Sequence, residues 1–426
     1  MRLATVFRRL LCLQGVRVTD VELHPDALMI FVDVDLGRRS CVCSRCGRRA
    51  RVGAYDSKVR LWRHLDLGPW ELYLRGRQRR FHCRRCQAVV TEALPWADTG
   101  AAFTREFEDT VAYFAQQTNA SVVSRTMQIA WPTVGNIVRR VVGRRGTPLA
   151  QRRLVRIGVD EISYRRHHKY LTLVADHLSG HIVWGGDGRS GATLGRFCDA
   201  LGPDGRASIE LVSLDMCQAY ITKLRERLPH ATLVFDPFHV VKLANAAVDE
   251  VRRAQVRALK GQNPARVAVK KTRWLVLKAP GNLDDEEAAK LALLAQANRP
   301  LYRAYLLKEA LRDVYDGSLP RARKQLRAWL AWAARSRLPA FVKLGRTIRQ
   351  YQDGILAAIE HGLSNGRLEG LNNKIRLLSH RAYGFHSADA LLALVTLCCT
   401  GINPPLPADR RPRMDPRPLA FPEGGK

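Results

Sequence analysis

Long apolar stretches are missing from this sequence. Its 426 residues contain no uninterrupted run of about 18 apolar side chains, which a membrane-spanning helix requires. The first segment, MRLATVFRRLLCLQG, has basic residues but lacks the long apolar core and the small-residue cleavage site of a signal peptide. We therefore expect no membrane span and no export, and we place the protein in the cytoplasm.

Acidic residues are few relative to basic ones. The sequence has 39 Asp and Glu against 70 Lys and Arg, which gives a formal net charge of +31. A surplus of this size predicts a polyanionic partner, and nucleic acid is the usual one because its binding releases counterions. The basic residues extend over the whole length, so the surplus is not confined to a tail. A surface charged for solubility is the alternative. DNA binding would also associate the protein with the nucleoid.

The ten cysteines favour a metal site in a reducing compartment over a disulfide framework. Five cluster early, in CVCSRCG and FHCRRCQ, and five are scattered. The early group contains two Cys-x2-Cys pairs, which can complete a closed tetrahedral zinc site that serves folding rather than chemistry. The predicted ligands are Cys43, Cys46, Cys83 and Cys86. The interval between the pairs exceeds the usual ribbon spacing, so unligated thiols, or Cys41 in place of Cys43, are alternatives.

The hydrophobic period changes several times along the chain. A strand-like, turn-rich part comes first, with an alternating run in ALMIFVDVDL and two short strands around the Gly-Pro turn of RLWRHLDLGPWELYLRGRQRRFHC. Helical spacing follows, and then β-rich runs between helices, interrupted by a long helical interval at about 238–360. The predicted domains are residues 1–100 (β-rich), 101–150 (helical), 151–400 (α/β) and 401–426 (a Pro-rich tail). The expected fold class is multidomain α/β.

The helical second domain fits a helix-turn-helix. We predict helices at about 105–116 and 121–127, and a third that Pro132 opens, where proline is tolerated. Val134, Ile137 and Val138 would face inward. The residues left for a DNA groove and its backbone are Thr133, Asn136, Arg139 and Arg140. A plain helical linker domain is the alternative.

Three strand-like runs of the third domain end in acids. LVRIGVDEIS ends in Asp160 and Glu161, IELVSLDM in Asp215, and ATLVFD in Asp236. Two further strands, joined at HLSGH, follow the first run, and a helix precedes each of the last two, so these should lie parallel to the first. Asp160 and Asp215 then share the carboxyl edge of a sheet, where such folds assemble their sites. Paired carboxylates favour a bridging cation, and two Mg²⁺ or Mn²⁺ ions suit phosphoryl transfer.

Glu369 is the candidate for a third carboxylate. It lies in SNGRLEGLNNKIRLLSHRAYGF, where Ser364 or Asn365 can cap a helix. The apolar stripe of this helix, suited to docking on a sheet, comprises Leu368, Leu371, Ile375 and Leu378. Glu369 shares another face with Asn372, Asn373 and Arg376, which resembles a surface for metal and phosphate. We predict that Asn373 and Arg376 contact DNA. An ion pair between Glu369 and Arg376 or a neighbouring residue is the alternative.

These motifs carry a family resemblance. VDEISYRRHHKYLTLVADHLSGHIV, SLDMCQAYITKLRERLPHATLVFDPFHVVKLANAAVDEVRR and the Glu369 motif together resemble the DDE transposases of bacterial insertion sequences, in the group named ISL-three. The resemblance implies a zinc-binding N-terminal module, a helix-turn-helix and an RNase H-like core with a large all-helical insertion at about 238–360. It places the catalytic triad on Asp160, Asp215 and Glu369.

The activity that this resemblance implies is DNA transposition. The protein would bind the terminal inverted repeats of its element and catalyse divalent-metal-dependent cleavage and strand transfer into target DNA, as a homodimer or a larger assembly. Rival functions are a DNA-binding regulator with an inactive core, an RNase H-like nuclease or resolvase, and a zinc hydrolase.

Two further acids near the predicted triad leave alternatives open. Asp236 competes with Asp215 for the second position, although it ends one strand too late, and we assign Asp236 and His239 to supporting or DNA-contacting roles. Glu161 should face away from Asp160, because side chains alternate along a strand, unless a turn brings it back. Trp274, Trp329 and Trp332, in the helical interval, are expected mostly in the core.

Overall fold

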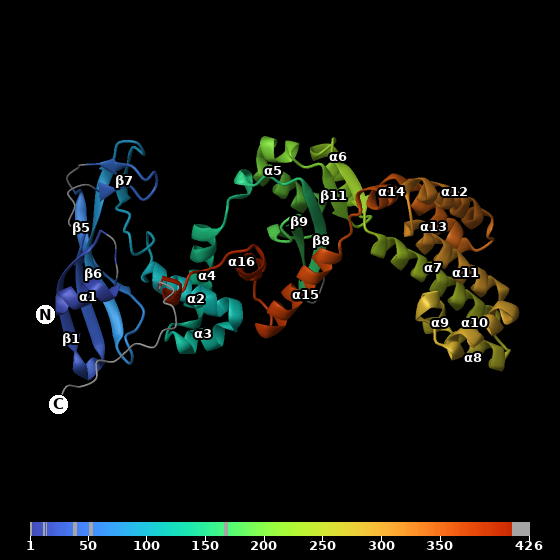
Figure 1. The fold of residues 1–426 in the computed structure, drawn as a ribbon, viewed down its shortest axis with the longest axis horizontal. Coiled ribbons are helices and arrows are strands. Elements are labelled where there is room, and N and C mark those ends of the chain that lie inside the picture. The colour runs from blue at the N-terminus through green and yellow to red at the C-terminus, as the bar shows by residue number, and fades with distance from the viewer. Residues whose placement is uncertain are drawn as a thin grey trace, which may run out of the picture. The chain divides into compact units, whose positions relative to one another are not determined.

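The structure is a computed structural model that describes residues 2–11, 13, 15–36, 41–50, 54–165 and 169–410. It divides into two compact units, Met1–Gly146 with Gly401–Lys426 and Thr147–Thr400, which are drawn together in Figure 1. Most of the predicted Pro-rich tail lies outside the described residues. No helix in the described ranges is long and apolar enough to cross a membrane.

A five-stranded sheet forms the first part of the N-terminal unit, with the order β1-β2-β6-β5 and with β7 added along β6. The alternating run of β2 buries Ile30, Val32 and Val34 on one face, as the sequence predicts. The two strands predicted around the Gly-Pro turn are β5 and β6. The elements are α1 (Leu3–Leu11), β1 (Arg17–His24), β2 (Met29–Asp35), β3 (Cys41–Val42), β4 (Arg49–Ala50), β5 (Asp56–Arg63), β6 (Glu71–Cys83) and β7 (Ala88–Thr91).

Three helices complete this unit. They are α2 (Arg105–Gln117), α3 (Ala120–Thr126) and α4 (Trp131–Arg145), which confirms the predicted helical elements. Thr104 and Asn119 cap α2 and α3 by accepting backbone N–H bonds. Val134, Ile137 and Val138 of α4 are buried, as their spacing predicts.

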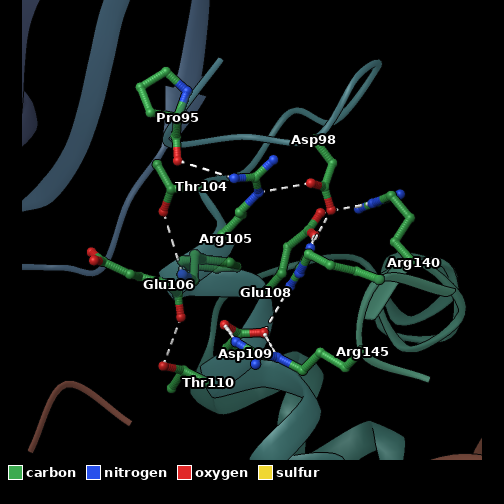
Figure 2. Close-up of polar contacts among 12 residues, drawn as sticks. Pro95, Asp98, Thr104, Arg105, Glu106, Glu108, Asp109, Thr110, Arg140 and Arg145 are labelled. Carbon is green, nitrogen blue, oxygen red and sulfur yellow. Dashed lines mark hydrogen bonds and ion pairs between the residues drawn. The ribbon is translucent and has the colours of Figure 1, made fainter. Parts of the chain in front are cut away.

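An ion-pair network fastens α4 to α2 (Figure 2). Glu108 and Asp109 of α2 are 0% and 2% exposed. Arg140 Nε lies 2.7 Å from Glu108 Oε1, and Arg145 bonds Asp109. Arg144 contacts both of these carboxylates and also Asp98, in the segment before α2. A buried carboxylate without a partner is strongly destabilising, so these arginines fix how α4 lies on α2.

The sheet of the second unit has the strand order β10-β9-β8-β11-β12. Strands β8, β9 and β10 are antiparallel neighbours, while β11 runs parallel to both β8 and β12, which confirms that the last two strands run parallel to the first. The elements are β8 (Arg156–Arg165), β9 (Lys169–Asp176), β10 (Ile182–Asp187), α5 (Gly191–Ala207), β11 (Leu211–Leu214), α6 (Gln218–Arg227) and β12 (Thr232–Phe235).

Strand β8 is longer than predicted. It continues to Arg165 rather than ending at Asp160 and Glu161, because β9 pairs with it as far as Arg165 and Lys169. Asp160 nevertheless lies beyond Gly158, the last β8 residue paired with β11, so the parallel part of the sheet does end beside it.

Helices cover both faces of this sheet. On one face, Val174 and Val159 pack in the same core as α5 and α6. On the other, Ile162, Leu171 and Leu173 pack against α15 (Gly366–Arg381) and α16 (Ala388–Cys399). The predicted stripe of α15 is confirmed, since Leu368, Ile375 and Leu378 are buried and Leu371 is half-buried against the same core.

Gly158 is what allows α15 to approach β8 so closely. A Cβ atom at this position would lie 2.6 Å from Leu368 Cδ1 and 2.9 Å from His177 Nε2. Any larger side chain at residue 158 would therefore displace one of these neighbours.

The interval between β12 and α15 is helical, as predicted. Of the three tryptophans in it, Trp329 is core and donates its Nε1–H to the Leu307 carbonyl at 2.7 Å, whereas Trp274 and Trp332 are exposed. Figure 1 shows these helices together, from α7 to α14. They are α7 (Pro237–Ala258), α8 (Asn263–Lys271), α9 (Arg273–Leu277), α10 (Asp285–Ala297), α11 (Arg299–Arg312), α12 (Leu319–Arg335), α13 (Pro339–Gln350) and α14 (Gln352–His361).

Candidate active site and zinc site

Three acids lie at one level of the parallel sheet. The register pairs Ser213 with Gly158 and Leu214 with Phe235. Two residues further along β8 and β11, the register places Asp160 beside Asp215. One residue further along β11 and β12, it places Asp215 beside Asp236. Adjacent strands are about 4.8 Å apart, so their carboxylates share one small region. Burial is the main cause of the raised pKa of Asp160 and of Asp236, and the nearby charge of Asp215 raises both further.

Asp160 is held by two donors. Its Oδ1 accepts the Glu161 backbone N–H at 2.7 Å, and its Oδ2 accepts Asn372 Nδ2 at 2.6 Å. Burial is the main reason why the pKa of Asp160 is raised, and the charge of Asp215 adds to it. A cation would relieve both effects, so the carboxylate pair fits an oxygen-ligated divalent ion.

His239 connects the second and third acids. Its Nε2 lies 2.7 Å from Asp215 Oδ1 and 4.0 Å from Asp236 Oδ2. Burial alone would lower the pKa of His239, but the hydrogen bond to Asp215 and the nearby carboxylates outweigh burial and raise it. Asp236 is buried and caps α7 by accepting the Phe238 N–H at 3.4 Å. Burial also raises the pKa of Asp236.

Glu161 lies on the other face of the sheet. Its carboxylate accepts a hydrogen bond from Tyr220 of α6, while Asp160 contacts α15. Burial raises the pKa of Glu161, and the Tyr220 bond opposes that effect. This placement follows the alternation expected along a strand.

A buried polar network that the sequence did not reveal anchors the start of α15. Ser213 Oγ donates to Asn365 Oδ1 at 2.5 Å and lies 2.6 Å from His177 Nε2. Arg367 Nη1 donates to the His177 carbonyl at 2.6 Å. Asn365, one of the two predicted caps, is the N-cap residue of α15, but its side chain makes no cap bond and is bound to Ser213 instead.

Glu369 is exposed on α15, one turn before Asn372 and on the same helical face. The predicted alternative, an ion pair with Arg376, is not among the ion pairs of the described residues; Arg376 donates to Asn373 Oδ1 at 2.8 Å. In the described ranges, the only group of three or more acidic, histidine or cysteine side chains within 4.8 Å of one another is made of cysteines. The structure therefore brings Asp160 and Asp215 together and places the helix that carries Glu369 beside them. The carboxylates of Asp160, Asp215 and Glu369 do not all lie within 4.8 Å of one another.

The four predicted zinc ligands converge in the N-terminal unit. The Sγ atoms of Cys43, Cys46, Cys83 and Cys86 all lie within 4.8 Å of one another. Cys43 and Cys86 are 3.8 Å apart, and Cys46 and Cys83 are 3.7 Å apart. Four sulfurs about 2.3 Å from one zinc ion would be about 3.8 Å apart, so the cluster fits this metal. Cys41 is outside the group, which leaves Cys43 in the predicted position.

Hydrogen bonds from the second cysteine turn support a thiolate there. The backbone N–H groups of Cys86 and Arg85 lower the pKa of Cys83 to about 6, although burial opposes them. A metal-binding sulfur must be deprotonated, and these N–H groups favour that form at Cys83, whereas the neighbouring Cys46 sulfur raises the pKa of Cys86 to about 12.

Comparisons with known proteins agree with this geometry. A family model of the DDE core, described as a transposase of ISL3 type, matches residues 157–395. The chain belongs to the ISL3 family of transposases. Two further models match this transposase: the helix-turn-helix domain of transposase family ISL3 over residues 92–142, and the zinc-finger of transposases IS204, IS1001, IS1096 and IS1165 over residues 39–86. The family resemblance noted in the sequence is thus confirmed.

Named relatives cover most of this ISL3 transposase. The transposase for insertion sequence element IS1557 of Mycobacterium tuberculosis, from strains CDC 1551 and H37Rv, is 42% identical over 86% of this chain and 87% of its own length. The transposase for insertion sequence element IS1001 of Bordetella parapertussis is 30% identical over 82% of this chain and 86% of its own. DDE transposases cleave DNA with divalent metal ions, and the helix-turn-helix implies DNA binding.

The residues of α4 predicted to contact DNA differ in their exposure and in their bonds to neighbouring side chains. Asn136 and Arg139 are exposed, with Arg139 Nη2 bonded to Asn136 Oδ1 at 2.6 Å, and Thr133 is half-buried. Arg140 is engaged by Glu108 within the network of Figure 2. On α15, Asn373 and Arg376 are both exposed.

Proposed function

We propose that this transposase binds the terminal inverted repeats of its own insertion sequence, cleaves the DNA there, and joins the freed 3′-hydroxyl to target DNA. The observation that supports this most is the alignment of Asp160 and Asp215 on neighbouring parallel strands, with the helix of Glu369 tied to Asp160 through Asn372. The printed names of the relatives, transposases for insertion sequence elements, agree with it.

The catalytic core is proposed to be RNase H-like. Three antiparallel strands followed by two parallel ones, in the order β10-β9-β8-β11-β12, support this fold. The eight helices from α7 to α14 would then be an insertion between the last strand and the helix that carries Glu369. The proposed domains remain 1–100 for zinc binding, 101–150 for the helix-turn-helix and 151–400 for catalysis.

The proposed metal ligands are Asp160, Asp215 and Glu369. Two divalent ions, Mg²⁺ or Mn²⁺, would activate an attacking oxygen and offset charge at the scissile phosphate. Asn372 keeps one oxygen of Asp160 in place, and His239 orients Asp215. Glu369 is exposed, so it can turn toward the other two acids when the site closes on DNA and metal.

DNA recognition is assigned to the N-terminal unit. The cysteine cluster would hold a structural zinc ion, and Thr133, Asn136, Arg139 and Arg140 of α4 would face DNA. On α15, Asn373 and Arg376 would contact the strand being cut. Because two transposon ends must meet, we propose a homodimer or larger assembly on nucleoid DNA.

Substitution of the second acid tests the assignment. Asp215→Asn preserves size but removes the negative charge, so Mg²⁺-dependent cleavage of end-containing DNA should fall to background while end binding is retained. The measurements are gel assays of cleavage and joining, with filter binding at fixed salt. Cleavage at the wild-type rate by Asp215→Asn would refute the triad. Wild-type protein that binds ends without cutting would indicate a regulator, and cutting without joining would indicate a nuclease.

A further inference from the structure

Two helices between β12 and α15, namely α12 and α13, lie in a stretch of chain that has no acidic residue. Residues 317–352 contain nine Lys and Arg but no Asp or Glu, and all nine basic side chains are exposed. On α11, by contrast, Arg312 pairs with Glu309 at 3.1 Å. Among the ion pairs of the described residues, none includes any of the nine. Their charges are therefore available to an anionic partner.

The helical period places these charges on the outer sides of α12 and α13, because both helices bury their apolar sides in the core of the second unit. Arg323 and Arg327 are one turn apart on α12. Lys343, Arg346 and Arg349 occur at every third position of α13, so each set shares one side of its helix. Like charges at this spacing repel one another, and a polyanion that binds them offsets the repulsion and releases its own counterions.

The end of α13 lies beside the proposed active site. Tyr351, the residue after α13, packs its ring against that of Phe235, with the centroids 5.2 Å apart, and Phe235 directly precedes Asp236. The Tyr351 hydroxyl donates to Gln218 Oε1 at 3.0 Å, and Gln218 follows Asp215 by three residues. The basic side of α13 therefore begins next to the carboxyl edge of the sheet.

The outer side of α12 suits contacts with phosphates rather than with bases. Ala328 and Ala334 are exposed between the charges, and their side chains are too short to reach the floor of a groove. Phosphate contacts position a duplex but carry no sequence information. With 17 residues, α12 is about 25 Å long, which corresponds to roughly seven base pairs of duplex.

We propose that the basic outer side of α12 and α13 binds the target DNA as a duplex, independently of its sequence, and leads it to Asp160 and Asp215. The proposed reaction needs two DNA partners. The N-terminal unit is assigned to the transposon ends, whose sequence must be recognised, and none of the residues proposed to contact DNA holds the target. This inference rests on the proposed function, because only strand transfer requires a target.

The test uses the full-length protein bound to an already cleaved end duplex. Gel shifts without added Mg²⁺ measure how this complex captures a second duplex of random sequence. The variant Lys343→Gln/Arg346→Gln/Arg349→Gln should fold like the wild type, because the three residues are exposed and glutamine is a comparable helix former. Its binding to the end duplex alone should be unchanged.

Capture of the second duplex should be weaker in this variant. We expect the Kd for that duplex to rise on the order of tenfold at fixed salt. The slope of log affinity against log salt should become shallower by about 2.7, since each lost phosphate contact contributes about 0.9. Joining of the cleaved end to a plasmid, measured with Mg²⁺, should then need a correspondingly higher plasmid concentration.

The matched control is Arg266→Gln/Lys270→Gln/Lys271→Gln, which removes three exposed charges from α8. Figure 1 shows α8 and α14 at opposite ends of this group of helices, and α14 directly follows α13. The control has the same net charge as the α13 variant, yet it should capture the second duplex like the wild type.

Three results would overturn the inference. They are unchanged capture by the α13 variant, equal losses in the α13 and α8 variants, and a loss of end binding by the α13 variant as large as its loss of capture. The last result would assign α13 to the transposon DNA instead. Wild-type protein that captures the second duplex through α13 but never cleaves or joins DNA would support this binding site and overturn the proposed function.

Discussion

Gly158 permits a sharp test of how α15 is held against the sheet. Replacing it with alanine adds one methyl group at a point where Leu368 Cδ1 would be 2.6 Å away and His177 Nε2 2.9 Å away. Neither neighbour can move freely, because Leu368 is 2% exposed and His177 is bonded to Ser213. The helix bearing Glu369 should therefore shift away from β8.

The expected magnitudes follow from the packing. Overfilling a close-packed site costs about 1–3 kcal/mol of unfolding free energy. A displacement of about 1 Å at a catalytic group can reduce the rate on the order of 100-fold. We therefore expect Gly158→Ala to remain folded, to bind transposon ends normally, and to cleave them on the order of 100-fold more slowly.

Urea unfolding and single-turnover cleavage measure the two effects. Gly370→Ala is the control for stability: this glycine lies in the same helix with no atom within 4 Å of the added methyl, so the substitution should stabilise by about 0.5–1 kcal/mol. Leu368→Ala alone creates a cavity, but combined with Gly158→Ala it makes room for the methyl. The double variant should thus lose less stability than the sum of the two single variants. Additive losses, or unchanged cleavage by Gly158→Ala, would refute the proposed docking of α15.

Two further predictions concern the zinc site and the buried histidine. Cys83→Ser should lose bound zinc, as measured by metal analysis, and should bind transposon ends more weakly, because metal binding contributes about 10–16 kcal/mol to the folding of such modules. Cys217→Ser, which lies outside the cluster, should retain the zinc. An unchanged zinc content in Cys83→Ser would contradict the assignment. Burial lowers the pKa of His177 below its ordinary 6.5, so the unfolded protein binds a proton at this ring more readily than the folded protein does. The contribution of the neutral ring to the free energy of unfolding is therefore fully present above pH 6.5 and declines as the pH falls below 6.5. Urea unfolding at pH 7.5 and 5.5 should show that the free energy of unfolding of the wild-type protein falls by at most about 1.4 kcal/mol per pH unit from this effect, and that of His177→Gln should not show this fall. The same dependence of unfolding free energy on pH in both proteins would rule out the role of His177.

Local patterns predicted those features that depend on neighbouring residues. The parallel direction of the last two strands followed from chain order and the need for helical crossovers, and the stripe of α15 followed from its 3.6-residue period. The cysteine ligands followed from the geometry of a tight turn. The length of β8 did not follow from a local pattern, because its last residues are extended through pairing with β9 rather than through their own sequence.

Pairings between distant residues were not predictable in this way. Nothing near Ser213 or Asn365 marks them as partners, since they meet only after the sheet and α15 have packed. Glu108 and Asp109 resemble a solvated helix face, yet both are buried, because Arg140 and Arg145 reach them from another helix. Partners for buried charges are fixed by tertiary packing, which a single sequence pattern does not report.

The ion pairs between α2 and α4 also bear on how the protein responds to ionic strength. Arg144 and Arg145 are engaged by buried carboxylates and so release no counterions from DNA, and the logarithm of affinity should fall with the logarithm of salt less steeply than the number of arginines on α4 implies. Buried pairs are also poorly screened. Salt that detaches this transposase from DNA should therefore leave α4, the proposed DNA-contacting helix, correctly oriented on α2, so that the protein can rebind when the salt is diluted.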